Sequence, residues 1–220
     1  MTITRSRPGR SEGPAARWSL LLLLSLAACF RFGGTLPPRE LYRLGAVSDT
    51  VARPSIRLPL PLAIAPYETP GIFANANIPY RIDDGEYGTY PSREWALPLS
   101  VMLGVMTQDR LAFAGARTTD VVYSPPSRTG FPYEWRGRVR RFEEVDRGTV
   151  VSVAVELEAR IVRTADDSVL WRGNFAAERP VVKPTMPGIV AALSAVAEEG
   201  ILKLGVDASR ALPLKVPPAQ

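Results

Sequence analysis

The clearest pattern of apolar and polar positions lies between Tyr133 and Glu178. From Val151 to Ile161 every second residue is apolar, and most residues between them are polar or charged. Alternation with a period of two indicates a β-strand with one buried and one solvated face. The preceding segment alternates in the same way until Phe142 falls out of phase, and a β-bulge near Arg140-Arg141 would restore the phase. A third alternating segment follows Asp166-Asp167, so this region predicts an antiparallel meander.

A basic stripe lies on the polar face of the first of these strands. It consists of Arg136, Arg138 and Arg140. Opposite charges on neighbouring strands stabilise a sheet, so we interpret the stripe as a solvated face that pairs with Glu156 and Glu158 rather than as a binding site.

Shorter strands are predicted in the first half of the chain. Residues 41–44 and 56–64 are largely apolar, and the second segment contains Pro59 and Pro61. Proline cannot donate to a strand ladder, which predicts that residues 56–64 lie at a sheet edge. Further on, residues 77–81 and 86–90 flank Asp83-Asp84-Gly85, a pattern typical of a tight turn between two strands.

Two long helices are predicted. Between Ser92 and Phe113 a stripe with spacings of four, three and four residues forms one apolar face, which we assign to the core. The stripe consists of Trp95, Leu99, Met102 and Met106. Pro98 is expected to kink the first turn. The second helix begins at Pro187, carries apolar residues at helical spacing, and is expected to stop at Gly205.

The N-terminal segment has the profile of an export signal. Four arginines precede a charge-free apolar run from Trp18 to Ala28, which is too short to cross a bilayer. The run closes with Leu26-Ala27-Ala28-Cys29, which resembles a bacterial lipobox, so we expect cleavage after Ala28 and lipid attachment to Cys29. The alternative is an ordinary secretory signal in which Cys29 stands by chance. We therefore expect a signal peptide at 1–28, a lipidated tether at 29–39, a single domain at 40–206 and a flexible tail at 207–220.

Charge and composition exclude several classes of function. The chain has 27 Lys and Arg against 22 Asp and Glu. Removing the signal segment, with its four arginines and one glutamate, leaves 23 against 21, and a net charge of +2 does not indicate nucleic-acid binding. The chain has no histidine and one cysteine, so the usual nucleophile–base pairs cannot be assembled. The same two residue types normally bind zinc, and their near absence does not favour a zinc site.

Acidic pairs are the remaining catalytic candidates. Asp83-Asp84 and Asp166-Asp167 are expected in turns, and Glu143-Glu144 at a strand end. Each pair therefore has a structural explanation, and no glycine-rich phosphate loop is present in the sequence. We expect a protein that is not an enzyme and needs no cofactor or metal.

Residues 78–111, IPYRIDDGEYGTYPSREWALPLSVMLGVMTQDRL, resemble the middle of the ABC-type transport auxiliary lipoproteins, the PqiC-like family. Tyr80-Arg81, Tyr90 and Trp95 fit its pattern, and so does RVRRFEE at 138–144. The resemblance extends over residues 40–206, with departures at Leu58–Leu62 and Ser124–Ser127. It implies an α/β domain with a mixed, largely antiparallel sheet and two long helices packed on it, similar to the N-terminal domain of TolB. It also implies an MCE-domain protein and an ABC permease as partners, in a transporter that moves lipids or hydrophobic compounds across the cell envelope.

Three functions follow as hypotheses. The first is a lipoprotein on the periplasmic side of the outer membrane that acts as docking component of an MCE-type transporter. Phe30 favours the outer membrane, because the common inner-membrane retention signal is an aspartate at that position. The second is a carrier that binds one lipid between sheet and helix, lined by Trp95, Met102 and Met106. The third is an envelope hydrolase that uses the acidic pairs at 83–84 or 143–144. The sequence does not determine the oligomeric state, and a homo-oligomer is one of the alternatives.

Overall fold

The computed structural model describes residues 38–45, 56–58, 61–114, 121–123 and 130–212. The described residues from Arg39 to Leu212 belong to one compact unit. The expected signal peptide, Cys29, Pro59, the Ser124–Ser127 loop and the tail beyond Leu212 lie outside the described residues.

The predicted meander is confirmed. It consists of β6 (Tyr133–Arg147), β7 (Val150–Arg163) and β8 (Val169–Pro180), joined by antiparallel ladders. The β6–β7 register shifts between Val139 and Arg141, so Arg140 is the bulged residue at the predicted place.

The other edge of β6 is covered by two strands from one stretch of chain. β2 (Leu62–Ile64) runs parallel to the start of β6, and β3 (Asn77–Ile82) runs parallel to its end. The short 3-10 helix η1 (Gly71–Ala74) lies between them in the sequence. β2 also pairs with β5 (Val121–Tyr123), so the predicted edge position of residues 56–64 is wrong. The paired residues begin only after Pro61, and proline therefore removes no ladder hydrogen bond.

The helix predicted from Ser92 begins later than expected. β4 (Glu86–Trp95) pairs with β3 across the predicted turn and continues to Trp95, while β1 (Glu40–Tyr42) runs parallel to its end. α2 spans Leu99–Phe113, with Pro98 at the N-cap. Proline and the residue before it disfavour helix ahead of this point, so Trp95 is buried from a strand and not from the helical face.

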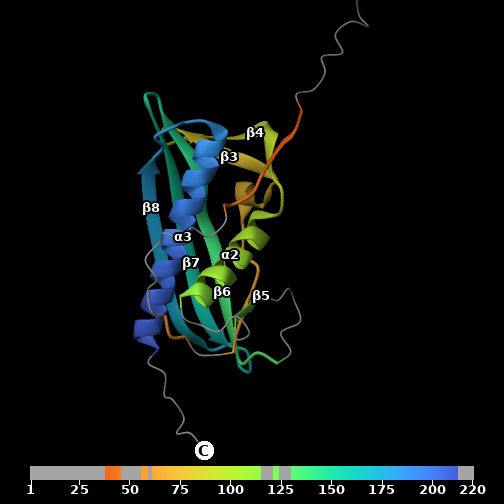
Figure 1. Ribbon diagram of the computed structural model, residues 1–220, viewed down its shortest axis with the longest axis vertical. Coiled ribbons are helices and arrows are strands. Elements are labelled where there is room, and N and C mark those ends of the chain that lie inside the picture. The colour runs from red at the N-terminus through yellow and green to blue at the C-terminus, as the bar shows by residue number, and fades with distance from the viewer. Residues whose placement is uncertain (1–37, 46–55, 59–60, 115–120, 124–129, 213–220) are drawn as a thin grey trace, which may run out of the picture. The chain divides into compact units, whose positions relative to one another are not determined.

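Both helices cover one face of the sheet (Figure 1). α3 spans Met186–Ala211 and packs against β7, β8 and α2. The predicted stop at Gly205 is wrong, because the helix continues for six residues beyond it. A Cβ at Gly205 would lie 2.8 Å from both Ile56 Cδ1 and Leu111 Cδ2, so this glycine permits close packing of the helix instead of ending it.

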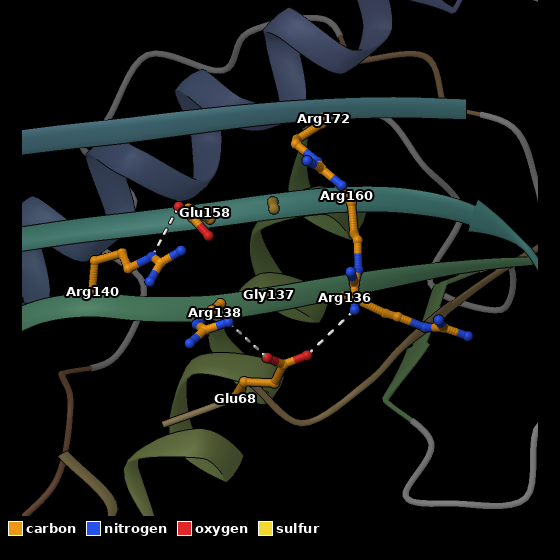
Figure 2. Close-up of a pocket in the computed structure, with 9 residues that line it drawn as sticks. Glu68, Arg136, Gly137, Arg138, Arg140, Glu158, Arg160 and Arg172 are labelled. Atoms are coloured by element: carbon orange, nitrogen blue, oxygen red, sulfur yellow. Dashed lines mark hydrogen bonds and ion pairs between the residues drawn. The ribbon is translucent and has the colours of Figure 1, made fainter. Parts of the chain in front are cut away.

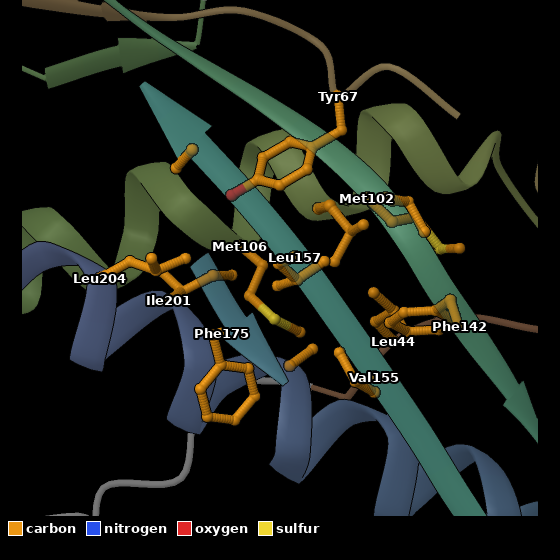
Figure 3. Close-up of a cluster of buried hydrophobic side chains, with 14 of the residues drawn as sticks. Leu44, Tyr67, Met102, Met106, Phe142, Val155, Leu157, Phe175, Ile201 and Leu204 are labelled. Atoms are coloured by element: carbon orange, nitrogen blue, oxygen red, sulfur yellow. The ribbon is translucent and has the colours of Figure 1, made fainter. Parts of the chain in front are cut away.

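The core lies between the helices and the sheet (Figure 3). Leu157 on β7, Phe142 on β6 and Ile201 on α3 are fully buried there. The described strands form one eight-stranded sheet in which most paired residues belong to antiparallel ladders. The predicted fold class, a mixed and largely antiparallel sheet with two helices packed on it, is therefore confirmed.

Candidate functional site

The two segments that carry the family resemblance contact each other in the centre of the sheet. From the β3–β4 hairpin, Trp95 packs its ring 5.9 Å from that of Phe142 on β6. Arg81 Nε lies 3.1 Å from Glu143 Oε1. The Tyr90 hydroxyl donates to Glu144 Oε2 over 2.8 Å. Three consecutive residues of β6 thus contact three residues of the hairpin through their side chains, in addition to the backbone ladder between β3 and β6.

The sequence predicted that Glu143 lies at a strand end, and this prediction is wrong. β6 continues to Arg147, and the Glu143 side chain is fully buried. Its Oε1 lies 3.1 Å from both Arg81 Nε and Arg141 Nε. A buried carboxylate between two guanidinium groups is strongly destabilised when a partner is removed, so the arrangement has a structural role.

Glu144 and Tyr90 form a second polar contact within this region. Burial raises the pKa of Glu144, although the hydrogen bond from Tyr90 opposes the change. Burial and the neighbouring Glu144 carboxylate raise the pKa of Tyr90. Arg93 lies 4.7 Å from the centre of the Tyr90 ring, in cation–π contact.

The other two acidic pairs lie in turns, as predicted. Asp83 and Asp167 have φ values of +49° and +54°, in the left-handed region. Asp84 forms ion pairs with Arg81 and Arg147, at 3.1 and 3.6 Å. Asp166 accepts hydrogen bonds from the side chain and backbone of Ser168, which lower its pKa.

The three acidic pairs thus take part in turns, ion pairs and hydrogen bonds. Among the described residues, no group of three or more Asp, Glu, His or Cys residues could hold a metal ion. The helices in that part of the chain are also too short or too polar to cross a membrane.

An apolar hollow of about 390 Å³ lies between α2 and residues 43–45. Its apolar lining consists of Leu44, Leu97, Met102, Val105 and Met106. Leu97 and Val105 are exposed there, at 53% and 40%. Of the three residues expected to line a lipid cavity between sheet and helix, Met102 and Met106 border this hollow, and Trp95 packs against Phe142 instead. All three are buried in the hydrophobic core, as predicted for the apolar stripe.

The polar rim of this hollow is formed by Arg43 and Asp109. Burial raises the pKa of Asp109, while the positive charge of Arg110 opposes the change. Gly45 donates its backbone N–H to Ser194 Oγ of α3 over 2.8 Å, which fixes the segment after β1 against that helix. The hollow could therefore take a hydrophobic chain whose polar end meets these charges.

The basic stripe pairs differently from the prediction. Arg140 Nε lies 2.9 Å from Glu158 Oε1, as expected. Arg138 instead approaches Glu68, and Arg136 binds Glu134 and Asp167. None of these three carboxylates lies on β7, because Glu68 approaches from the segment after β2, Glu134 belongs to β6 itself and Asp167 lies in the turn after β7. A hollow of about 260 Å³ lies beside this stripe and is also lined by Arg160 of β7 and Arg172 of β8. The sequence analysis did not predict it, although both arginines lie on the polar faces of their strands.

Comparison with known proteins agrees with this fold. A family model described as the ABC-type transport auxiliary lipoprotein component matches residues 42–200. A crystal structure of a protein from Xanthomonas campestris is similar with a TM-score of 0.64 and 21% identity, covering 78% of this chain and 96% of that one.

Two further solved structures are similar. The structure of an uncharacterized protein has a TM-score of 0.56 and 18% identity, covering 79% of this chain and 98% of that one. A PelC dodecamer from Paraburkholderia phytofirmans has a TM-score of 0.44 and 12% identity, with 72% and 90% covered. No curated protein matches the chain. At these identities the solved structures show the fold alone.

Proposed function

Because the chain belongs to the family of ABC-type transport auxiliary lipoprotein components, we propose that it is the docking component of an MCE-type lipid transporter. In this proposal it stands on the periplasmic side of the outer membrane and catalyses no reaction. The observation that carries the proposal is the match of the family model over residues 42–200, which follow a sequence that resembles a lipobox at residues 26–29. The engagement of the acidic pairs in ion pairs and turns supports a role in binding partners instead of chemistry.

The proposed anchor is a lipid on Cys29 after cleavage behind Ala28. The ten residues between Cys29 and Glu40, where β1 begins, span roughly 30 Å when fully extended. Such a tether keeps the domain near its membrane, where it can meet a transporter that crosses the periplasm. Phe30 supports outer-membrane sorting, since the inner-membrane retention signal would place an aspartate there.

Affinity purification from native membranes tests this proposal. The C-terminally tagged, lipidated protein is expected to recover an MCE-domain protein and an ABC permease. A tagged Cys29→Ser variant serves as the matched control, because it keeps the domain and loses the anchor. If the wild-type protein recovers neither partner under conditions that preserve a known envelope complex, the docking proposal is wrong.

The apolar hollow supports a second candidate function, a carrier that binds one hydrocarbon chain. Its volume of about 390 Å³ falls at the lower end of the range for small-molecule sites. Native mass spectrometry would detect a lipid bound in addition to the covalent anchor. Val105→Lys, inside the hollow, should abolish this lipid, whereas Val150→Lys at the exposed start of β7 should not. Consistent absence of bound lipid from the wild-type protein would exclude the carrier.

A further inference from the structure

The sheet face opposite the helices holds a hollow walled by arginines (Figure 2). Its volume is about 260 Å³. Gly137 and Ala159 form its floor with their backbone, because their Cβ positions face the core. Side chains from three neighbouring strands therefore stand around a shallow, rigid base.

Three of these arginines form a row across the sheet. Arg136 on β6 is paired in register with Arg160 on β7, and Arg160 with Arg172 on β8. Like charges directly opposite each other destabilise a sheet. The row is therefore costly for the folded protein unless an anion neutralises it.

The carboxylates nearby do not neutralise the whole row. Arg136 is matched by Glu134 and Asp167. Among the described residues, the one carboxylate within 4 Å of Arg160 is Glu68, at 3.3 Å. Arg172 is exposed and has no carboxylate within that distance in the same part of the chain.

The hollow also contains a buried hydrogen-bond donor, Arg138 Nε, that has no acceptor within the described part of the chain. The other end of its guanidinium group lies 3.7 Å from Glu68 Oε2. Glu68 thus places one carboxylate between Arg138 and Arg160, at the mouth of the hollow (Figure 2). This carboxylate marks where an external anion would bind.

We propose that the arginine hollow binds a phosphate group, presented either by a lipid headgroup or as free phosphate. Planar guanidinium groups bind phosphate oxygens through paired hydrogen bonds, which a single ammonium group cannot do. The hollow is smaller than sites for whole drug-sized molecules, which suits a headgroup or an ion. The bound phosphate displaces Glu68 and engages Arg138, Arg160 and Arg172. This inference is independent of the transporter partner and of the apolar hollow.

Calorimetric titration of the mature lipoprotein in detergent tests the site. The two probes are inorganic phosphate and glycerophosphoglycerol, a lipid headgroup without acyl chains. Arg172→Gln should weaken binding about tenfold, as expected for the loss of a charged hydrogen bond. Glu68→Gln should strengthen binding several-fold, because the competing carboxylate is gone. Arg210→Gln removes the same charge from a 78% exposed side chain on α3 and should leave affinity unchanged.

The outcomes separate the sources of phosphate. Tighter binding of glycerophosphoglycerol than of phosphate assigns the site to a lipid headgroup, and the reverse order assigns it to free phosphate. Binding of neither probe overturns the proposal, as does an equal loss in Arg172→Gln and Arg210→Gln. If only a glutamate-rich peptide binds, the proposal is also wrong and the face belongs to an acidic protein partner. Circular dichroism of each variant confirms that it is folded.

Discussion

Gly137 allows the Tyr67 side chain to pack against the centre of the sheet, and replacing it tests the packing directly. A Cβ at this position would lie 2.3 Å from Tyr67 Cε1 and 2.4 Å from Tyr67 Cζ. Carbon atoms pack at about 3.5 Å or more, so the ring must move by about 1 Å in Gly137→Ala. Tyr67 is buried, and its hydroxyl shares a 2.8 Å hydrogen bond with Thr107 and accepts one from Trp135 Nε1 over 3.3 Å.

The expected cost combines overpacking with weakened hydrogen bonds. Overpacking a core costs about 1–3 kcal/mol, and each lost hydrogen bond adds about 1 kcal/mol. We therefore expect Gly137→Ala to lower the free energy of unfolding by about 3 kcal/mol. This is a large share of the total, because a typical domain has a free energy of unfolding of about 5–15 kcal/mol. Urea denaturation followed by circular dichroism measures this change. Gly85→Ala is the matched control, because a Cβ there meets no atom within 4 Å and should alter stability little.

A double-mutant cycle with Tyr67→Leu isolates the clash. Shortening the side chain removes the ring, so adding Ala at position 137 should then cost less than about 1 kcal/mol. The coupling energy should be about 2 kcal/mol. If Gly137→Ala costs the same in both backgrounds, or costs nothing in the wild type, the ring does not depend on this glycine and the reasoning is refuted.

Three further predictions concern charge and anchoring. Burial raises the pKa of Glu144 above 4.5, so the stability it contributes is present at low pH and is lost as pH rises from 4.5 through the folded pKa. In Glu144→Gln the free energy of unfolding should therefore decline less than in the wild type as pH rises over that window. Urea denaturation at several pH values measures this, and a difference between the two proteins that does not change with pH would contradict it. Arg110 and Glu198 form a buried 2.6 Å ion pair between α2 and α3, so Arg110→Met should cost about 3–5 kcal/mol. Adding Glu198→Leu should recover most of that loss in thermal unfolding, whereas no recovery would show that the pair is not the cause. Cys29→Ser should give an uncleaved or soluble form with a folded domain, and tight outer-membrane fractionation after a high-salt wash would refute the anchor.

Several features could be predicted from the sequence because they depend on neighbours along the chain. Strand alternation across residues 150–180 follows from which residues face the core, and the bulge at Arg140 follows from a break in that alternation. The turns at residues 83–85 and 166–167 follow from residue types that tolerate left-handed backbone. The order of weak motifs was sufficient to indicate the family, because together they reflect the whole fold.

The tertiary structure decided what depends on contacts between distant segments. Trp95 has helical spacing to Leu99, yet it ends β4, where it pairs with Tyr42 of β1 and its ring lies 5.9 Å from that of Phe142. From the sequence Gly205 is typical of a helix end, whereas in the structure it lies inside α3 and lets Ile56 and Leu111 pack closely against the helix.

The same limit applies to the charged residues. The sequence by itself determined that Arg136, Arg138 and Arg140 alternate along the polar face of β6. Only the register of the ladders placed Arg136, Arg160 and Arg172 side by side. Only the packing of the segment after β2 along β6 brought Glu68 close to Arg160. The physical reason is that periodicity depends on local backbone geometry, whereas a site depends on which segments meet, and many pairings are compatible with the same pattern.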